Sequence, residues 1–195
     1  MKFFRFALLG LVLLSAGWLV ANSRAATETP AFQVVEKQGD FEIRDYPKLE
    51  TVVAPMESAT NDNGSFSKLF RFITGANARE EKISMTTPVL IDREAPENTM
   101  SFILPKETAE KGAPEPKNPE VKLATRAAGR FAALRFGGKG TREEEETAQK
   151  KLSAWIQERG LKSAGAPLVA YYDPPWTPSA IKRNEVLIPL EKSDL

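Results

Sequence analysis

A rigid aromatic loop stands beside a basic cluster near the C-terminus, where residues 171–186 read YYDPPWTPSAIKRNEV. Its prolines restrict the backbone and remove amide donors, so the stretch cannot continue as an ordinary helix or a central strand. Trp176 lies inside this loop, and two interpretations of it stay open. It either fills a core, or it forms one wall of a site for a flat, apolar, anionic molecule whose charge meets Lys182 and Arg183.

A second candidate cluster lies earlier, on a segment whose apolar residues follow helical spacing. These residues are Phe66, Leu69, Phe70 and Ile73. If all four face one core, the stripe needs no functional explanation. If they do not, the adjoining Arg71 brings a cation to the edge of an apolar surface, which is a usual form of small-molecule site. Met85, in KISMTTPV, is either a core filler or a direct ligand contact.

The sequence contains no cysteine and no histidine. The first absence excludes disulfides, thiolate nucleophiles and cysteine metal sites, and the second excludes Ser-His catalysis and histidine metal sites. Residues 1–25 hold three of the 27 basic groups and none of the 26 acidic ones, so the rest of the chain has 24 basic groups and a net charge of −2. A balance of this kind argues against a nucleic-acid partner.

The N-terminus is typical of an export signal. Lys2 and Arg5 precede an apolar run over residues 6–21, and Ser23-Arg24-Ala25 supplies a small-x-small cleavage site. The run is shorter than the roughly 20 residues of a comfortable membrane span. We therefore expect residues 1–25 to be a signal peptide, with a retained N-terminal anchor as the alternative. Either interpretation predicts a periplasmic or secreted protein, or one anchored to the membrane and facing outside the cytoplasm.

After a linker over 26–31, the chain predicts one α+β domain over 32–195. Alternating and apolar runs predict strands at 32–36, 41–46, 49–57, 82–91, 99–104, 121–126, 130–136, 167–172 and 184–190. Ser65 is expected to cap a first helix that ends at Gly75. Thr141 and Glu144 have the spacing of a capping box for a second helix that ends at Gly160, and the acidic run 143–146 is expected to be a solvated face.

The order of a strand pair, a helix and another strand pair occurs twice, in halves of about 32–104 and 120–190. The Pro-rich segment 105–119 between them is expected to be an exposed connection. Two such units bury each other's strand edges when their strands close together. The sequence therefore predicts two pseudo-symmetric halves forming a distorted antiparallel β-barrel with two packed helices.

Three separated motifs resemble the SOUL heme-binding-protein family. They are FSKLFRFITGAN (66–77) leading into EKISMTTPV (81–89), FGG (136–138), and YDPPWTPSAIKRNEV (172–186). The likeness runs over about residues 32–190 and implies the same two-halved barrel. It also implies binding of heme or another porphyrin in a shallow apolar groove beside the first helix. The groove positions that carry over are Phe66, Phe70, Arg71, Tyr172 and Trp176.

The chain departs from the family at two points. Thr177 stands where some members have a basic residue, and some members are thought to ligate iron through a histidine that this chain lacks. We therefore expect a non-enzymatic protein that buffers or carries a tetrapyrrole without histidine ligation and touches a membrane only through an uncleaved N-terminus. The expected cofactor-binding residues are Phe66, Phe70, Arg71, Met85, Tyr172, Trp176 and Arg183. The alternatives are an enzyme acting on tetrapyrroles and a binding module for other amphipathic ligands or a protein partner.

Overall fold

The structure, a computed structural model, describes residues 27–56, 64–93 and 98–191, so the predicted signal peptide lies outside the described residues. The strands are β1 (Gln33–Gln38), β2 (Phe41–Tyr46), β3 (Leu49–Pro55), β4 (Val89–Asp92), β5 (Thr99–Ile103), β6 (Lys122–Arg126), β7 (Gly129–Phe136), β8 (Leu168–Tyr171) and β9 (Asn184–Pro189). The helices are α2 (Ser65–Ile73), α3 (Lys106–Lys111), α4 (Arg142–Glu158) and the short 3-10 turn η1 (Ser179–Ile181).

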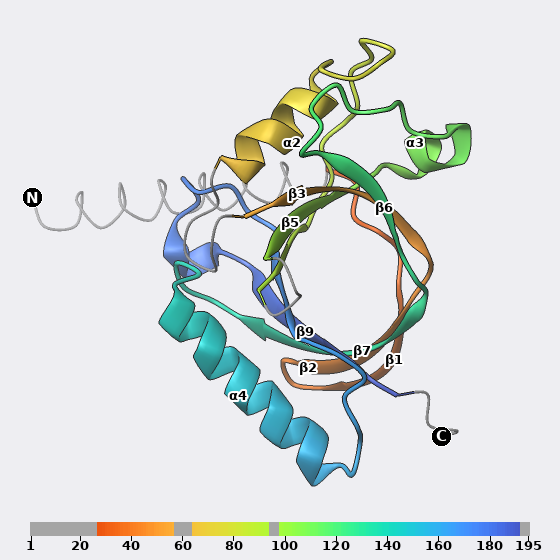
Figure 1. The fold of residues 1–195 in the computed structure, drawn as a ribbon. Coiled ribbons are helices and arrows are strands. Elements are labelled where there is room, and N and C mark those ends of the chain that lie inside the picture. The colour runs from red at the N-terminus through yellow and green to blue at the C-terminus, as the bar shows by residue number, and fades with distance from the viewer. Residues whose placement is uncertain (1–26, 57–63, 94–97, 192–195) are drawn as a thin grey trace, which may run out of the picture.

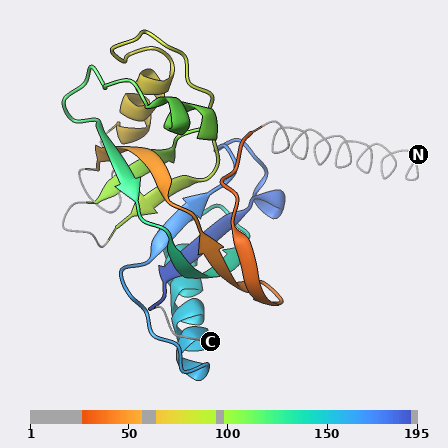
Figure 2. The same ribbon diagram turned by 90° about the vertical axis from the view of Figure 1, so that its right-hand side faces the viewer.

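One curved sheet of nine strands forms the distorted barrel, in the order β1-β2-β7-β9-β8-β4-β5-β3-β6. The strand pairs are antiparallel, and α2 and α4 pack outside the sheet, well apart from each other, in both views (Figure 1 and Figure 2). This arrangement confirms the predicted α+β barrel with two packed helices. Among the described residues, no helix has the length and apolar character needed to cross a membrane.

The sheet order shows how the two halves are joined. From the central pair β4 and β8 outward, the strands on the two sides match: β5 with β9, β3 with β7, and β6 with β2, while β1 has no counterpart. The outer strands are exchanged, since β2 pairs with β7 and β6 pairs with β3. Each half therefore covers a strand edge that the other would leave open.

Strand alternation divides the core into three apolar clusters. One lies beneath α2, one beneath α4 and one inside the barrel. On β9, for example, Val186 and Ile188 face α4, whereas Leu187 points into the barrel. The two helices are thus held by separate clusters on the outer surface of one shared sheet.

The structure corrects several details of the predicted elements. Gly64, not Ser65, is the N-cap of α2, and the Ser65 hydroxyl instead donates to the carbonyl of Pro55 at 2.6 Å. Residues 82–88 are not a strand: Thr86 forms only an isolated parallel bridge with Glu28, and the amide of Thr87 donates to the carbonyl of Glu28 at 2.9 Å. The predicted connection also contains α3, which follows Pro105 and ends at Gly112.

Candidate functional site

The outer surface of α2 carries two neighbouring aromatic rings, which we call the aromatic face. The rings of Phe66 and Phe70 are stacked, with centroids 6.0 Å apart and planes inclined by 12°. They are 40% and 47% exposed. Phe66 also meets the ring of Phe102 on β5 edge-on at 5.3 Å, which fixes its position. The pair offers a flat apolar surface for a planar molecule to cover.

The rotation of α2 explains why these rings are exposed. The buried side of the helix consists of Ser65, Leu69, Phe72 and Ile73. Of the four residues with helical spacing, Leu69 and Ile73 therefore belong to the core, whereas Phe66 and Phe70 lie beside it. The interpretation in which all four face one core is wrong. Large exposed aromatic side chains that lie together are uncommon and mark interaction sites more often than packing.

The second half of the fold provides an internal comparison. The buried side of α4 includes Ala148, Leu152, Trp155 and Ile156, which have the same spacing as the buried side of α2. Aligning these two sets places Gln149 at the position of Phe66 and Ser153 at the position of Phe70. A helix packed in the same way on the same sheet does without exposed aromatic residues, so packing does not explain the aromatic face.

Arg71 and Met85 lie differently with respect to this face. Arg71 lines a cleft of about 220 Å³ together with Lys68 and residues 116–118, and its Nε donates to the carbonyl of Ser67 at 3.3 Å. Because positions on a helix advance by about 100° per residue, Lys68 lies across the helix from the aromatic face, whereas Arg71 lies about a quarter turn from Phe70. Met85 is partly buried against the cluster beneath α2.

The Pro-rich loop projects Trp176 into solvent. A turn closed by the amide of Thr177 and the carbonyl of Pro174, at 3.0 Å, leaves the indole 83% exposed. The interpretation of Trp176 as a core filler is therefore wrong. The loop can present this side chain to a ligand, and the fixed backbone of its prolines reduces the entropy lost when it is ordered.

Tyr172 and Arg183 come together inside the barrel instead. The guanidinium of Arg183 lies 3.9 Å from the centroid of the Tyr172 ring, and the Tyr172 hydroxyl donates to Glu185 at 3.0 Å. Burial raises the pKa of Tyr172, and the nearby carboxylate of Glu185 raises it further. The structure thus brings Phe66 and Phe70 together on α2 and groups Tyr172 with Arg183 elsewhere.

Glu185 is the centre of a buried ion network that the sequence did not reveal. It accepts hydrogen bonds from Arg44 at 2.6 and 3.1 Å and from Arg183 at 2.7 and 3.0 Å. Burial alone would raise the pKa of Glu185, but the hydrogen bonds and charges of Arg44 and Arg183 outweigh burial and lower it. The sequence does show a charged residue, Glu185, at an inward position of an otherwise apolar strand. It does not show the partner, because Arg44 lies 141 residues earlier in the chain.

The prediction that the acidic run 143–146 forms a solvated face is wrong for Glu145. Glu144 completes the expected capping box with Thr141. Glu145, however, is only 2% exposed, and it accepts hydrogen bonds from Arg93 at 2.9 and 3.0 Å and from the hydroxyl of Tyr171. This residue ties α4 to β4 and β8 and does not belong to a solvated face.

Comparisons with known proteins identify the family. The profile of the SOUL heme-binding protein family matches residues 27–189. Heme-binding protein 2 from Homo sapiens is 28% identical over 149 residues, which cover 69% of this chain and 72% of the human protein.

Solved structures share the fold at lower identity. A hydrolase from Listeria innocua has a TM-score of 0.55 and 13% identity, over 80% of this chain and 94% of its own. The C-terminal domain of EcmrR has a TM-score of 0.54 and 16% identity, over 83% of this chain and 99% of its own. At these identities the likeness extends to the fold alone.

Proposed function

Because the chain belongs to the SOUL heme-binding protein family, we propose that it binds heme or a related tetrapyrrole on the aromatic face of α2. The observation that carries the proposal is the stacked, exposed pair Phe66 and Phe70, which has no counterpart on α4. We further propose that the protein buffers or carries this ligand outside the cytoplasm, as the export signal predicted from the N-terminal sequence favours.

Apolar contact supplies the affinity in this proposal. Covering a few hundred Å² of apolar surface, at about 25 cal/mol per Å², gives several kcal/mol before ordering costs. Micromolar affinity requires about 8 kcal/mol net, so without a bond to iron the covered surface must extend beyond the two exposed rings. The chain has no histidine or cysteine. Ligation of iron by the protein would therefore need a weaker donor such as a tyrosine, methionine or lysine.

The Pro-rich loop is the proposed second contact. Trp176 is exposed and held by a rigid turn, which suits a residue that closes over one edge of a macrocycle. Met85 packs beside the core beneath α2. The assignments of Arg71, Tyr172 and Arg183 to the site stay predictions of the family resemblance, since these side chains point to other parts of the molecule.

Titration of the full chain with hemin and with metal-free protoporphyrin tests the proposal. Soret absorbance and tryptophan quenching follow binding to the parent, to Phe66→Ser/Phe70→Ser and to the matched α4 variant Gln149→Ser. We expect both porphyrins to bind the parent and the α4 variant, and to bind the double α2 variant much more weakly. Equal binding to all three proteins would move the site away from the aromatic face.

The same materials separate the two rival functions. An enzyme acting on tetrapyrroles would consume bound hemin when a reductant is supplied, and absorbance spectra over time would show the product. A module for other amphipathic molecules would bind unrelated detergents or lipids as tightly as porphyrins. We do not expect turnover, because the chain has no histidine or cysteine. We do not expect equal binding of flexible amphiphiles, because a pair of stacked rings favours planar ligands.

A further inference from the structure

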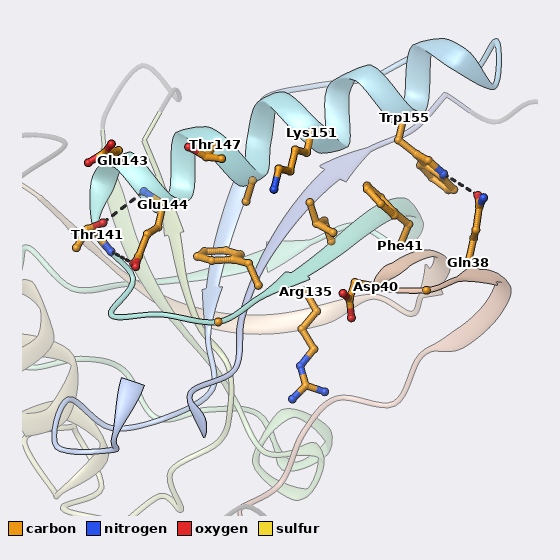
Figure 3. A pocket seen from close by; sticks show the side chains of 15 residues that line it. Gln38, Asp40, Phe41, Arg135, Thr141, Glu143, Glu144, Thr147, Lys151 and Trp155 are labelled. Atoms are coloured by element: carbon orange, nitrogen blue, oxygen red, sulfur yellow. Dashed lines mark hydrogen bonds between the residues drawn. The ribbon is translucent and has the colours of Figure 1, made fainter. Parts of the chain in front are cut away.

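An open groove of about 850 Å³ lies between α4, the end of β7 and the turn that joins β1 to β2 (Figure 3). Its charged side chains are of both signs, with three carboxylates and two cations. The indole Nε1 of Trp155 donates to Gln38 at 3.0 Å, and the amide of Thr141 donates to Glu144 at 2.8 Å (Figure 3). These polar groups are satisfied within the protein, so the groove gives no sign of a ligand.

A much smaller cavity inside the barrel differs in this respect. Its volume is about 20 Å³, and its wall is almost entirely apolar. Leu90, Ile103, Phe131, Leu168 and Leu187 line it, and all five belong to the apolar cluster inside the barrel. A single water-sized species needs about 10–15 Å³ of such space. The cavity therefore has room for one such species and excludes organic ligands.

Arg126, at the end of β6, brings a cation to the wall of this cavity. Its side chain is partly buried, and its Nε is buried without a hydrogen-bond partner in the described part of the chain. Buried N–H groups almost always have a partner, and an exception points to a water or an ion. The missing partner of Arg126 can lie in the cavity that this residue lines.

The positive charge of Arg126 is incompletely compensated by the protein. Burial lowers the pKa of Arg126, and the negative charge of Asp92 on β4 raises it only in part. Among the described residues, Arg126 is the only charged one that lines the cavity. A buried cation without a full counter-charge is destabilising. An anion in the cavity supplies both the missing acceptor and the missing charge.

Three prolines close the cavity and leave few donors around it. They are Pro30 of the N-terminal segment, Pro47 and Pro88, and proline has no amide N–H. The other polar side chain of the wall is Tyr46, whose hydroxyl accepts a hydrogen bond from Arg44 at 3.1 Å. The guanidinium is therefore the unsatisfied donor of this wall.

We propose that the cavity is a site for one monatomic anion, a halide such as chloride, which accepts the hydrogen bond of Arg126 Nε. A buried water usually makes about three hydrogen bonds, and this apolar wall offers too few. An anion gains more than a water from one charged donor. This site goes beyond tetrapyrrole binding and does not use the aromatic face, because it lies inside the barrel.

Crystals of the full chain soaked in sodium bromide test the proposal directly, because bromide gives an anomalous signal that water lacks. We expect an anomalous peak beside Arg126 Nε in the parent and none at this place in Arg126→Met. Replacing an incompletely paired buried charge with an apolar side chain of similar length is often neutral or stabilising, so we expect the variant to fold.

Urea unfolding measures the same site in solution. When chloride replaces about 0.2 M gluconate at constant ionic strength, the folding equilibrium constant of the parent should rise about fivefold, as a dissociation constant of about 50 mM gives. Lys122→Met removes an exposed cation from the same strand and should show the same rise, whereas Arg126→Met should show none. The proposal is overturned if the parent cavity shows no bromide peak, or if Arg126→Met keeps the full dependence on chloride.

Discussion

Replacing Phe66 and Phe70 with serine should weaken porphyrin binding by about thirtyfold. A phenylalanine has roughly 200 Å² of surface, so exposures of 40% and 47% leave roughly 170 Å² open on the two residues. A planar ligand that covers half of this area gains about 2 kcal/mol at 25 cal/mol per Å². That free energy corresponds to about a thirtyfold change in the dissociation constant.

The same substitution should also lower stability. Phe66 and Phe70 are each more than half buried and lose the ring contacts they make with each other and with Phe102, so we expect the free energy of unfolding to fall by about 3–5 kcal/mol. Denaturant unfolding measures this change, and hemin titration at equilibrium measures affinity. A variant with leucine at both positions keeps apolar area but loses planarity, and it should bind with intermediate affinity.

Two results would refute this reasoning. If the serine variant binds porphyrin as the parent does, the aromatic face is not the site. If its binding falls only in proportion to its unfolded fraction, the rings act through stability alone. The matched Gln149→Ser variant on α4 controls for a general effect of changing a helix surface, and it should match the parent in both measurements.

Four other outcomes are expected. Hemin and metal-free protoporphyrin should bind within about tenfold of each other in parallel titrations, and a strong hemin preference with a low-spin spectrum would contradict this. Trp176→Ala should leave the melting temperature unchanged and weaken porphyrin binding, and unchanged binding would exclude the loop as a wall. Glu185→Gln should cost about 3–5 kcal/mol at neutral pH, measured by denaturant unfolding, because Arg44 and Arg183 lose their buried counter-charge. N-terminal sequencing should show that the exported protein begins near Ala26, and an intact Met1 terminus in a membrane fraction would favour a retained N-terminal anchor.

The sign of the pH dependence follows from the lowered pKa of Glu185. A carboxyl whose pKa is lower in the folded state stabilises the fold above its unfolded value, near 4.5, and this contribution is lost as the pH falls through the folded value. The parent should therefore lose stability below about pH 4.5, and Glu185→Gln should lose less over the same range. An equal acid loss in both proteins would assign it to other carboxyl groups.

Local patterns in the sequence predicted most of the architecture. The capping box of Thr141 and Glu144 marked the start of α4, and the repeated order of strands and a helix predicted the duplication. Hydrophobic periodicity could not fix the rotation of α2, because Phe66 and Phe70 satisfy the same spacing as its buried residues. Only packing against β3 and β5 decides which side of this helix is covered.

Long-range polar partners account for the main errors. Glu145 looked like a first-turn acid on a solvated face, yet it is buried by Arg93, which lies 52 residues earlier. Arg44 and Glu185 are likewise joined only by the pairing of β2 and β9 with β7. Local rules of capping and charge describe a single helix or strand, so they cannot reveal ion pairs that form when distant strands meet.

The duplication itself separates function from packing. Both halves must bury a helix on the same sheet, so positions that serve packing are matched: Leu69 corresponds to Leu152, and Ile73 to Ile156. Positions that differ between the two halves are not fixed by the packing of the helix on the sheet. The first half has an exposed aromatic face, whereas the second has the polar residues Gln149 and Ser153 at the aromatic positions. The exposed ring pair is therefore a feature of the first half that the shared packing does not require.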